Sequence, residues 1–567
     1  MRGIIGATRK NRSIRAREIS SRTKSECLFE LVYSMIFRGC LGVLLLMVLA
    51  GCSGGSGDVN AGYSNGVSIG QSGETNAVTP ILLHESIPRF YGLTVTANFQ
   101  EIELANVPVN IRRSWINPPI PERYFRDSAV AMFDMEDEYV EISVTRPAGV
   151  ESAVVRPARA NITPTINGDT VTFIIRRWGQ YVLEFNDDPL TDGLHIFANP
   201  PFVPTENSRQ ITGSHHGNLH VNDGETVTLM PGSVVHGGVT MGNNTRIEGR
   251  GIIWGHGPQN FVADGQVLSQ NANAIRVWDS TNVEVDGIAA FNQSRWVVEF
   301  RNSYNVDISN IKIISAGNNG DGITIQSSRN MRIDRSFVRS WDDALVVKNY
   351  SPIDSGDISF TNMVLWVDLA QAMEIGYETN AGNESWFGGR FNRDAQIYNI
   401  LFEDIDVVHA NHQSVISIHN DNRALVRDIV FRNIIVDNAN MSATHFRYLI
   451  DFRNYGKPHS FQGYRNCDGE HWAIDNIIVD GVWVMGGRRE WAGWVFNDMN
   501  GRRPITGVYI SNVFWVPGME SLWEDMHGAP DGVSFMASPF IAPPLEVCFE
   551  GVRQCPAFDA YTGEFLE

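Results

Sequence analysis

The chain has 567 residues, of which 43% are hydrophobic and 10% aromatic, and its formal net charge is −19. This apolar content is enough to bury a large core, which excludes an intrinsically disordered chain. A strongly acidic surface argues against nucleic acid as a partner, because it repels phosphates. The 52 glycines, together with many asparagines and β-branched residues, favour an all-β architecture with frequent turns.

Residues 1–51 are typical of an export signal region. An apolar run from Leu41 to Ala50 is too short to cross a bilayer but fits the core of a signal peptide, and Arg38 supplies its positive flank. Met35 would be a more ordinary start than Met1, so residues 1–34 are expected not to be translated and are left out of the fold argument.

The apolar run ends in Leu49-Ala50-Gly51-Cys52, which resembles the lipobox of bacterial lipoproteins, where the cysteine becomes lipidated. Residues 52–78 are rich in Gly, Ser and Asn, as expected of a flexible linker between a lipid anchor and a folded domain. We therefore expect an exported lipoprotein, anchored in the outer membrane through Cys52 and facing the periplasm or the cell surface. A plain signal peptide followed by an unrelated cysteine is the alternative.

Residues 79–200 predict a small antiparallel β-sandwich. Apolar and polar residues alternate there in short runs, for example at residues 139–144 and 170–175, and turn residues separate the runs. The alternation ends at residues 194–200, where the periodicity changes.

A different repeat occupies residues 201–540 and predicts a solenoid of stacked coils. Each repeat begins with an Asn or Asp before a short β-branched strand, and further strands follow. Early repeats are 23 to 27 residues apart, whereas later ones are longer, which indicates loops inserted on one face. A β-propeller would need longer blades, and a leucine-rich solenoid would need a leucine spacing that is absent. The repeats begin at Asn282, Asn305, Asn330, Asp357, Asn399, Asp428 and Asn476.

Two acidic segments stand out within this repeat, Gly320-Asp321-Gly322 and Asp342-Asp343, and each lies immediately before a predicted strand. Asp321 and Asp343 are 22 positions apart, about one coil, so we expect them on neighbouring strands roughly 4.8 Å apart. Like charges at that distance raise at least one pKa. An inverting glycosidase needs one protonated acid and one basic partner that activates water. Taken singly, each aspartate could equally lie in a solvated turn.

The two acidic segments together resemble the catalytic signature of the pectin-lyase-like glycoside hydrolases, which include family 28 (polygalacturonases) and family 49 (dextranases and isopullulanases). The resemblance covers about residues 218–517, and the sandwich before it is similar to the family 49 arrangement. It implies a right-handed parallel β-helix in which Asp342 is the general acid and Asp321 and Asp343 activate water. It also implies inversion in a single displacement, with no cofactor and no metal.

The chain departs from family 28 at two places. Family 28 has a Gly-His-Gly where this chain has residues 370–376, without the histidine, and it has an Arg-Ile-Lys grip for carboxylates that is missing near residues 417–423. Pectate is therefore a poor substrate candidate, and a neutral polysaccharide is favoured. Polar residues near the strand ends could bind its hydroxyls, namely Lys348, Gln371, Glu374, Glu378, His412, His419 and Asn420.

These observations favour a monomeric, endo-acting α-glucan hydrolase similar to dextranases. The alternatives are a polygalacturonase-like hydrolase of an acidic or marine glycan, a polysaccharide lyase, which would use calcium and an Arg or Lys base, and a non-catalytic glycan-binding lipoprotein. Residues 541–567 are expected to form a C-terminal tail, in which Cys548 and Cys555 could form a disulfide or remain thiols. Aromatic residues of the later loops could stack on sugars or cap the core, namely Trp386, Phe387, Trp472, Trp491 and Trp494.

Overall fold

The computed structural model describes residues 78–113, 122–136, 138–186, 193–255, 273–293, 295–350, 353–379, 395–421, 424–443, 447–454, 473–497 and 505–517, with a few short strands beyond. Among these residues no helix is long and apolar enough to cross a membrane. Several predictions lie outside them: those on Cys52 and its linker, on Cys548 and Cys555, on Trp386, Phe387 and Trp472, and on the side chains of Trp491 and Trp494.

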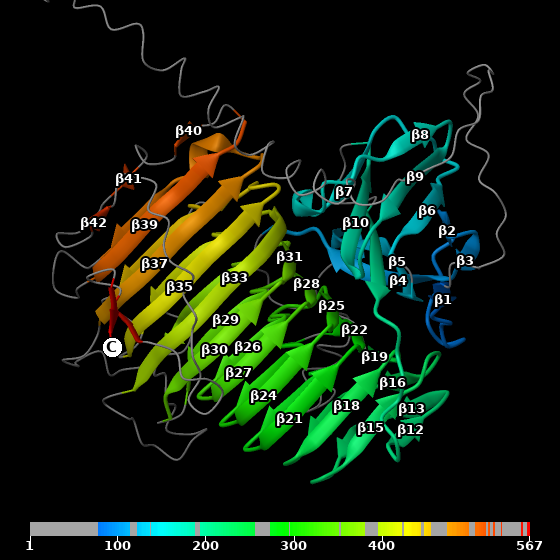
Figure 1. Cartoon of the computed structure of the whole chain (residues 1–567), viewed down its shortest axis with the longest axis horizontal. Coiled ribbons are helices and arrows are strands. Elements are labelled where there is room, and N and C mark those ends of the chain that lie inside the picture. The colour runs from blue at the N-terminus through cyan, green and yellow to red at the C-terminus, as the bar shows by residue number, and fades with distance from the viewer. Residues whose placement is uncertain are drawn as a thin grey trace, which may run out of the picture. The chain divides into compact units, whose positions relative to one another are not determined.

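The first part of the described chain consists of two β-sheets that share one hydrophobic core (Figure 1). Most neighbouring strands are antiparallel, as the alternating sequence predicts, but β5 and β11 pair in parallel. The first sheet contains β1 (Val78–Pro80), β4 (Leu104–Asn110), β5 (Phe125–Met135), β7 (Ala153–Arg156), β10 (Gly179–Phe185) and β11 (Gly193–Asn199). The second contains β2 (Thr94–Ala97), β3 (Gln100–Ile102), β6 (Val140–Thr145), β8 (Thr165–Asn167) and β9 (Thr170–Ile175). Two short 3-10 turns are η1 (Glu122–Tyr124) and η2 (Ala158–Ala160).

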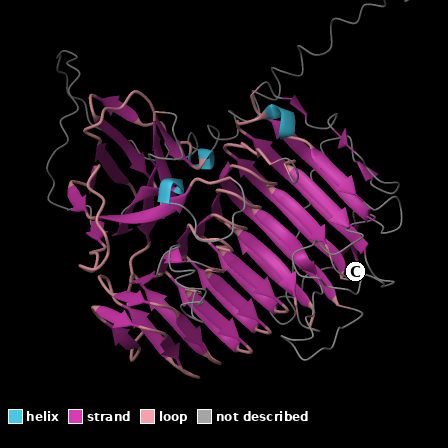
Figure 2. Cartoon of the chain, turned by 180° about the vertical axis from the view of Figure 1, so that it is seen from behind, coloured by secondary structure: helices cyan, strands magenta, loops and turns pink. Residues whose placement is uncertain are grey.

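From β12 onward the chain winds through three strand positions per coil, and each strand pairs in parallel with the strand of the next coil (Figures 1 and 2). The first ladder contains β12 (Arg209–Ile211), β15 (Thr226–Leu229), β18 (Thr245–Gly249), β21 (Thr281–Asp286), β24 (Tyr304–Ser309), β27 (Arg329–Asp334), β30 (Ser355–Thr361), β33 (Gln396–Ala410), β35 (Leu425–Val436), β37 (Ala473–Val484) and β39 (Ile505–Trp515). The second contains β13 (Ser214–His216), β16 (Val234–His236), β19 (Ile252–Trp254), β22 (Ala289–Gln293), β25 (Lys312–Ser315), β28 (Phe337–Ser340) and β31 (Val364–Val367), and it continues into β33.

The third ladder contains β14 (Leu219–Val221), β17 (Val239–Met241), β20 (Ile275–Trp278), β23 (Val298–Arg301), β26 (Ile323–Gln326), β29 (Leu345–Asn349), β32 (Met373–Thr379), β34 (Ile416–Asn420), β36 (Ile450–Asn454), β38 (Trp494–Asn497) and β41 (Met526–His527). The remaining elements are η4 (Arg489–Trp491), β40 (Glu520–Ser521), β42 (Ser534–Phe535), β43 (Ala557–Asp559) and β44 (Glu564–Leu566). The chain is therefore an all-β protein in which a parallel β-helix follows a β-sandwich, which confirms the predicted fold class.

The repeat that the sequence shows corresponds to one corner of each coil. All seven residues that begin the repeats have a left-handed backbone, with φ between 51° and 59°. Asn and Asp tolerate this conformation better than other residues that carry a side chain. Successive corners are joined by side-chain hydrogen bonds, because Asn305 Nδ2 donates to Asn282 Oδ1 (2.6 Å) and Asn330 Nδ2 donates to Asn305 Oδ1 (3.0 Å). The motif thus fixes both the turn and the stacking.

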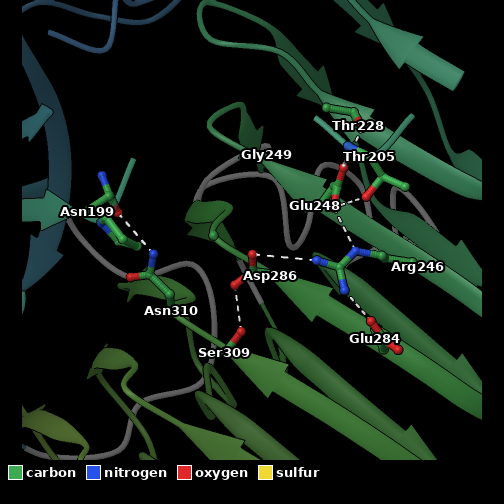
Figure 3. Close-up of polar contacts among 12 residues, drawn as sticks. Asn199, Thr205, Thr228, Arg246, Glu248, Gly249, Glu284, Asp286, Ser309 and Asn310 are labelled. Carbon is green, nitrogen blue, oxygen red and sulfur yellow. Dashed lines mark hydrogen bonds and ion pairs between the residues drawn. The ribbon is translucent and has the colours of Figure 1, made fainter. Parts of the chain in front are cut away.

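The outer face of the first ladder carries charged residues that connect successive coils (Figure 3). Arg246 donates from Nε to Glu248 Oε2 (2.7 Å) and also pairs with Glu284 on the next coil. Glu248 in turn accepts from the backbone N–H of Thr205 (2.6 Å), in the segment that leads into the β-helix. The first coils are therefore tied to one another and to the chain that precedes them.

The β-sandwich packs against the second ladder through a separate hydrophobic cluster. This cluster contains Val107 and Phe197 from the sandwich and Phe291, Phe337 and Trp366 from the β-helix, all fully buried. Polar contacts accompany it. One of them is the bond from Asn310 Nδ2 to Asn199 Oδ1 (3.3 Å), which Figure 3 shows. The sandwich is thus part of the same packed body as the β-helix.

We predict that Asn305→Ala destabilises the protein by about 1–2 kcal/mol, because alanine is strained at a φ of 59° and cannot continue the ladder. Asn305→Gly should cost less, because glycine adopts this conformation freely. Calorimetric unfolding of the two variants measures the difference. Equal losses would show that the left-handed corner imposes no constraint.

Candidate active site

The two acidic segments lie at the turn between the second and third ladders, on consecutive coils. Gly322 N donates to Asp343 O (2.8 Å), and Ala344 N donates to Gln371 O (2.9 Å). Asp321, Asp343 and Gln371 therefore form one column that runs across three coils. The spacing of 22 residues thus brings the two aspartates together, as the sequence predicts.

Asp342 joins this column from the side because the chain turns before β29. Its carboxylate accepts a hydrogen bond from the backbone N–H of Asp343 (3.1 Å), and its backbone O accepts from Ser340 Oγ (2.7 Å). A local Asp-to-backbone bond of this kind is typical of turns. The doublet therefore does not follow the alternation of an extended strand, and both carboxylates belong to one cluster with Asp321.

Lys348 supplies the positive charge of this cluster. Its Nζ lies 3.3 Å from Asp321 Oδ2 and 3.3 Å from Glu378 Oε2, and 4.7 Å from the centre of the Trp296 ring. Burial alone would lower the pKa of Lys348, but Glu378 and Asp321 outweigh it and raise this pKa well above its usual value. The ammonium group is therefore charged at any physiological pH.

The three aspartates are almost covered, with exposed fractions of 2% for Asp321, 6% for Asp342 and 5% for Asp343. Burial raises the pKa of Asp321, and Lys348 opposes that rise. Burial raises the pKa values of Asp342 and Asp343 well above the usual range, and the charge of Asp321 raises both further. Asp343 also raises the pKa of Asp342, and Glu374 also raises the pKa of Asp343. Lys348 thus favours the ionised form of Asp321, whereas burial and the neighbouring acids favour the protonated form of the doublet.

Gln371 connects the column to a second buried group. Its backbone N–H donates to Asp343 Oδ1 (3.1 Å), and its side-chain amide donates to the hydroxyl of Tyr377 (3.4 Å). The Tyr377 ring stacks on His419 with the ring centres 4.6 Å apart. His419 Nδ1 lies 2.9 Å from Glu374 Oε1. Burial alone would lower the pKa of His419, but Glu374 and Asp451 outweigh it and raise this pKa to about 9.

The residues predicted to bind substrate therefore fall into two groups. Glu374, His419 and Asn420 have no exposed surface and are held by protein partners, because His419 Nδ1 lies 2.9 Å from Glu374 Oε1 and Asn420 Nδ2 donates to Asn454 Oδ1 (3.0 Å). Their role as hydroxyl ligands stays a prediction. Gln371 has an exposed fraction of 1% and positions Asp343.

The second group keeps some exposed surface. The Glu378 side chain is 23% exposed and contacts Lys348, which is itself buried, so these two lie at the edge of the cluster. His412 is partly exposed, and its Nδ1 lies 2.9 Å from Ser442 Oγ. Burial and the charge of Arg113 lower the pKa of His412 to about 4. The imidazole is therefore neutral under most conditions.

Sequence reasoning missed three features of the site. Trp296 belongs to the same column as Asp321, because Val297 N donates to Asp321 O (2.8 Å), and counting back one coil from Asp321 would have found it. Tyr377 gave no signal of its own. The β-sandwich also reaches the turns of the site, because Asn110 Nδ2 donates to Ala316 O (3.1 Å) and Trp341 Nε1 donates to Arg112 O (2.8 Å).

A parallel β-helix with carboxylates stacked on consecutive coils is the arrangement expected from the resemblance to the pectin-lyase-like fold. Comparison with known families gives a more particular match. The model for glycosyl hydrolases family 28 matches residues 231–444, the part of the chain that contains all three aspartates. The matched part is less than half of the chain.

Individual proteins resemble the chain at low identity. Polygalacturonase QRT2 from Arabidopsis thaliana is 25% identical over 199 residues, which are 31% of this chain and 44% of that protein, so the match spans less than half of the relative's length. Among solved structures, Dex49A from Penicillium minioluteum has a TM-score of 0.49 at 13% identity, covering 78% of this chain and 91% of that one. The family 28 exopolygalacturonase of Yersinia enterocolitica has a TM-score of 0.41 at 13% identity, covering 66% and 89%.

We predict that Lys348→Met costs about 3–5 kcal/mol near pH 7, because it leaves the buried Asp321 without its cation. The pKa of Asp321 then rises further, and a raised carboxyl pKa removes stability as the pH rises from the pKa of the unfolded chain to that of the folded protein. The deficit should therefore shrink towards about pH 4, where the unfolded chain also binds the proton. Urea unfolding at the two pH values measures this.

The control for this prediction is the double variant Asp321→Asn with Lys348→Met. It removes the buried carboxylate as well as the cation and leaves only the partly exposed Glu378 without its partner, so its stability deficit should depend on pH much less than that of the single variant. A single variant whose deficit is the same at both pH values would contradict the assigned ion pair.

Proposed function

We propose that the protein is an inverting glycoside hydrolase that cleaves a polysaccharide. One observation carries the proposal: Asp321, Asp342 and Asp343 form one buried cluster on two consecutive coils, with a lysine in direct contact with Asp321. Two carboxyl groups with different protonation states are what this reaction needs.

The roles follow from the surroundings of each acid. Asp342 is the general acid, because burial and two neighbouring acids keep its pKa well above the usual range and its proton available to the leaving oxygen. Asp321 is the base, because Lys348 stabilises its ionised form. Asp343 shares the activation of water with Asp321, and the N–H of Gln371 orients one of its oxygens. A water attacks the anomeric carbon as the leaving group takes the proton, so the configuration inverts.

Dextranase-like, endo-acting cleavage of an α-glucan is the substrate assignment we favour, because the chain lacks the family 28 residues for a galacturonate carboxylate. A specific observation supports the alternative, a polygalacturonase-like hydrolase of an acidic glycan. Arg301 precedes Gln326 and Lys348 in the same column of the third ladder, and its guanidinium lies 3.6 Å from the centre of the Trp278 ring. A cation beside an aromatic ring suits an anionic sugar.

Three further expectations remain proposals. We propose that Cys52 is lipidated and holds the enzyme at the outer membrane, and that the enzyme acts as a monomer without a cofactor.

A polysaccharide lyase would release unsaturated products and lose activity on chelation of calcium. A non-catalytic glycan-binding lipoprotein would bind without any turnover.

We predict that Asp342→Asn lowers kcat at least about a hundredfold while substrate binding stays nearly unchanged, because the variant cannot donate a proton. The assay measures reducing ends from dextran and from polygalacturonate, with the product anomers followed by proton NMR. Asp307→Asn is the matched control, since Asp307 is exposed on β24, away from the cluster. Near wild-type activity of Asp342→Asn, or early products that retain configuration, would contradict the proposal.

We also predict that the β-sandwich positions the acids through Asn110. Asn110→Ala should lower kcat about tenfold with little change in KM, because it frees Ala316 and shifts the turn that carries Asp321. Asn199→Ala is the matched control: Asn199 is equally buried between sandwich and β-helix but contacts Asn310, in the corner before the second ladder. If kcat falls equally in both variants, in parallel with stability, Asn110 is merely structural.

A further inference from the structure

A cavity of about 500 Å³ lies between the β-sandwich and the β-helix, apart from the carboxylate cluster. Its sandwich wall contains Arg159, Arg177 and Trp178, and its β-helix wall contains Arg335 and Asp404. A second cavity of about 570 Å³ shares Arg159 and Arg177 with it, so the two are adjacent. Arg335 and Asp342 lie near opposite ends of β28, roughly 20 Å apart at about 3.3 Å per residue.

The walls of this cavity are held together by specific bonds. Arg159 Nε donates to Asp406 Oδ1 (2.7 Å) and Arg159 Nη2 donates to Asn433 O (2.8 Å). Gln180 Nε2 donates to Arg335 O (2.9 Å) on the opposite side. Because sandwich and β-helix are cross-linked at two points, the cavity keeps a defined shape.

The backbone of Arg335 gives an independent reason to consider this cavity a site. Arg335 belongs to the corner between the first and second ladders and has a φ of 48°. The other corner residues of this series with a positive φ are glycine, asparagine or aspartate, namely Gly287, Asn310, Asn362, Asp404, Asn433, Gly481 and Asn512. An arginine with a left-handed backbone reduces stability, and strain of this kind is retained where a side chain has a function.

The chemistry of the lining fits a sugar. The Arg335 side chain is 50% exposed, and its guanidinium lies 5.8 Å from the centre of the Trp178 ring, which packs against the sandwich core and is partly exposed. An aromatic face suits the apolar side of a pyranose ring, and guanidinium and carboxylate groups suit its hydroxyls.

We propose that this cavity is a second carbohydrate-binding site, which holds a segment of the polysaccharide remote from the bond that is cut. The proposal rests on the proposed function for the nature of its ligand. It assigns the sandwich a role in substrate capture, because Trp178, Arg177 and Arg159 all come from that domain. Cleavage of a short oligosaccharide that fills only the carboxylate site does not need this cavity.

The decisive variant is Arg335→Asn, which restores the usual residue of the corner. It should keep or raise the unfolding temperature, yet weaken polymer binding at least about threefold, because the guanidinium is lost while the strain is relieved. Binding is measured by affinity electrophoresis in gels that contain dextran or polygalacturonate, in an Asp342→Asn background that prevents cleavage. Trp178→Ala should weaken binding in the same gels.

Arg332→Asn is the matched control. Arg332 is 60% exposed, and it pairs with Asp334 (Nη2 to Oδ2, 3.6 Å) as Arg335 does, but it does not line the cavity. It should bind polymer as the parent does. The proposal is overturned if Arg335→Asn binds as tightly as the parent, or if neither polymer retards the parent. If the wild-type protein hydrolyses none of the polymers, that result counts against the proposed function instead. The two failures are therefore distinguishable.

Discussion

The closed coil of this β-helix depends on a backbone conformation that most residues avoid. Each coil turns at corners with a positive φ, and Asn or Asp occupies most of them. Such residues both accept the left-handed conformation and bond to their counterparts on adjacent coils. The corners thereby fix the register, and the register decides which side chains meet. Asp321 and Asp343 are neighbours only because the corners hold their coils one strand spacing apart.

The carboxylate cluster depends in turn on one buried cation. Burial works against the ionisation of all three aspartates, and Lys348 favours it mainly at Asp321, to which it is bonded. A site with no cation would keep every acid protonated, whereas one with several would ionise them all. The single lysine creates the difference in protonation state that acid–base catalysis needs, and the strand register places it there, because Lys348 pairs with Gln326.

Much of this arrangement could be predicted from the sequence because it repeats. The left-handed corners need Asn or Asp at a fixed spacing, so Asn282, Asn305 and Asn330 reveal the coils, and the same spacing pairs Asp321 with Asp343. Burial does not repeat in this way. Polar residues near strand ends are usually solvated, so the sequence does not indicate that Glu374 and His419 have no exposed surface. The contact between Arg112 and Trp341 joins segments 229 residues apart and has no local pattern.

The β-sandwich then acquires a role that its sequence does not suggest. It contacts both ends of β28: Arg112 receives the bond from Trp341 immediately before the acid doublet, and Gln180 bonds to Arg335 at the other end. A strand held at both ends cannot shift along its axis without breaking one of these bonds. Because Asp342 and Asp343 follow this strand directly, a fixed position of β28 means a fixed position of the doublet. The sandwich, which forms one wall of the cavity lined by Arg335, therefore also restrains the carboxylate cluster.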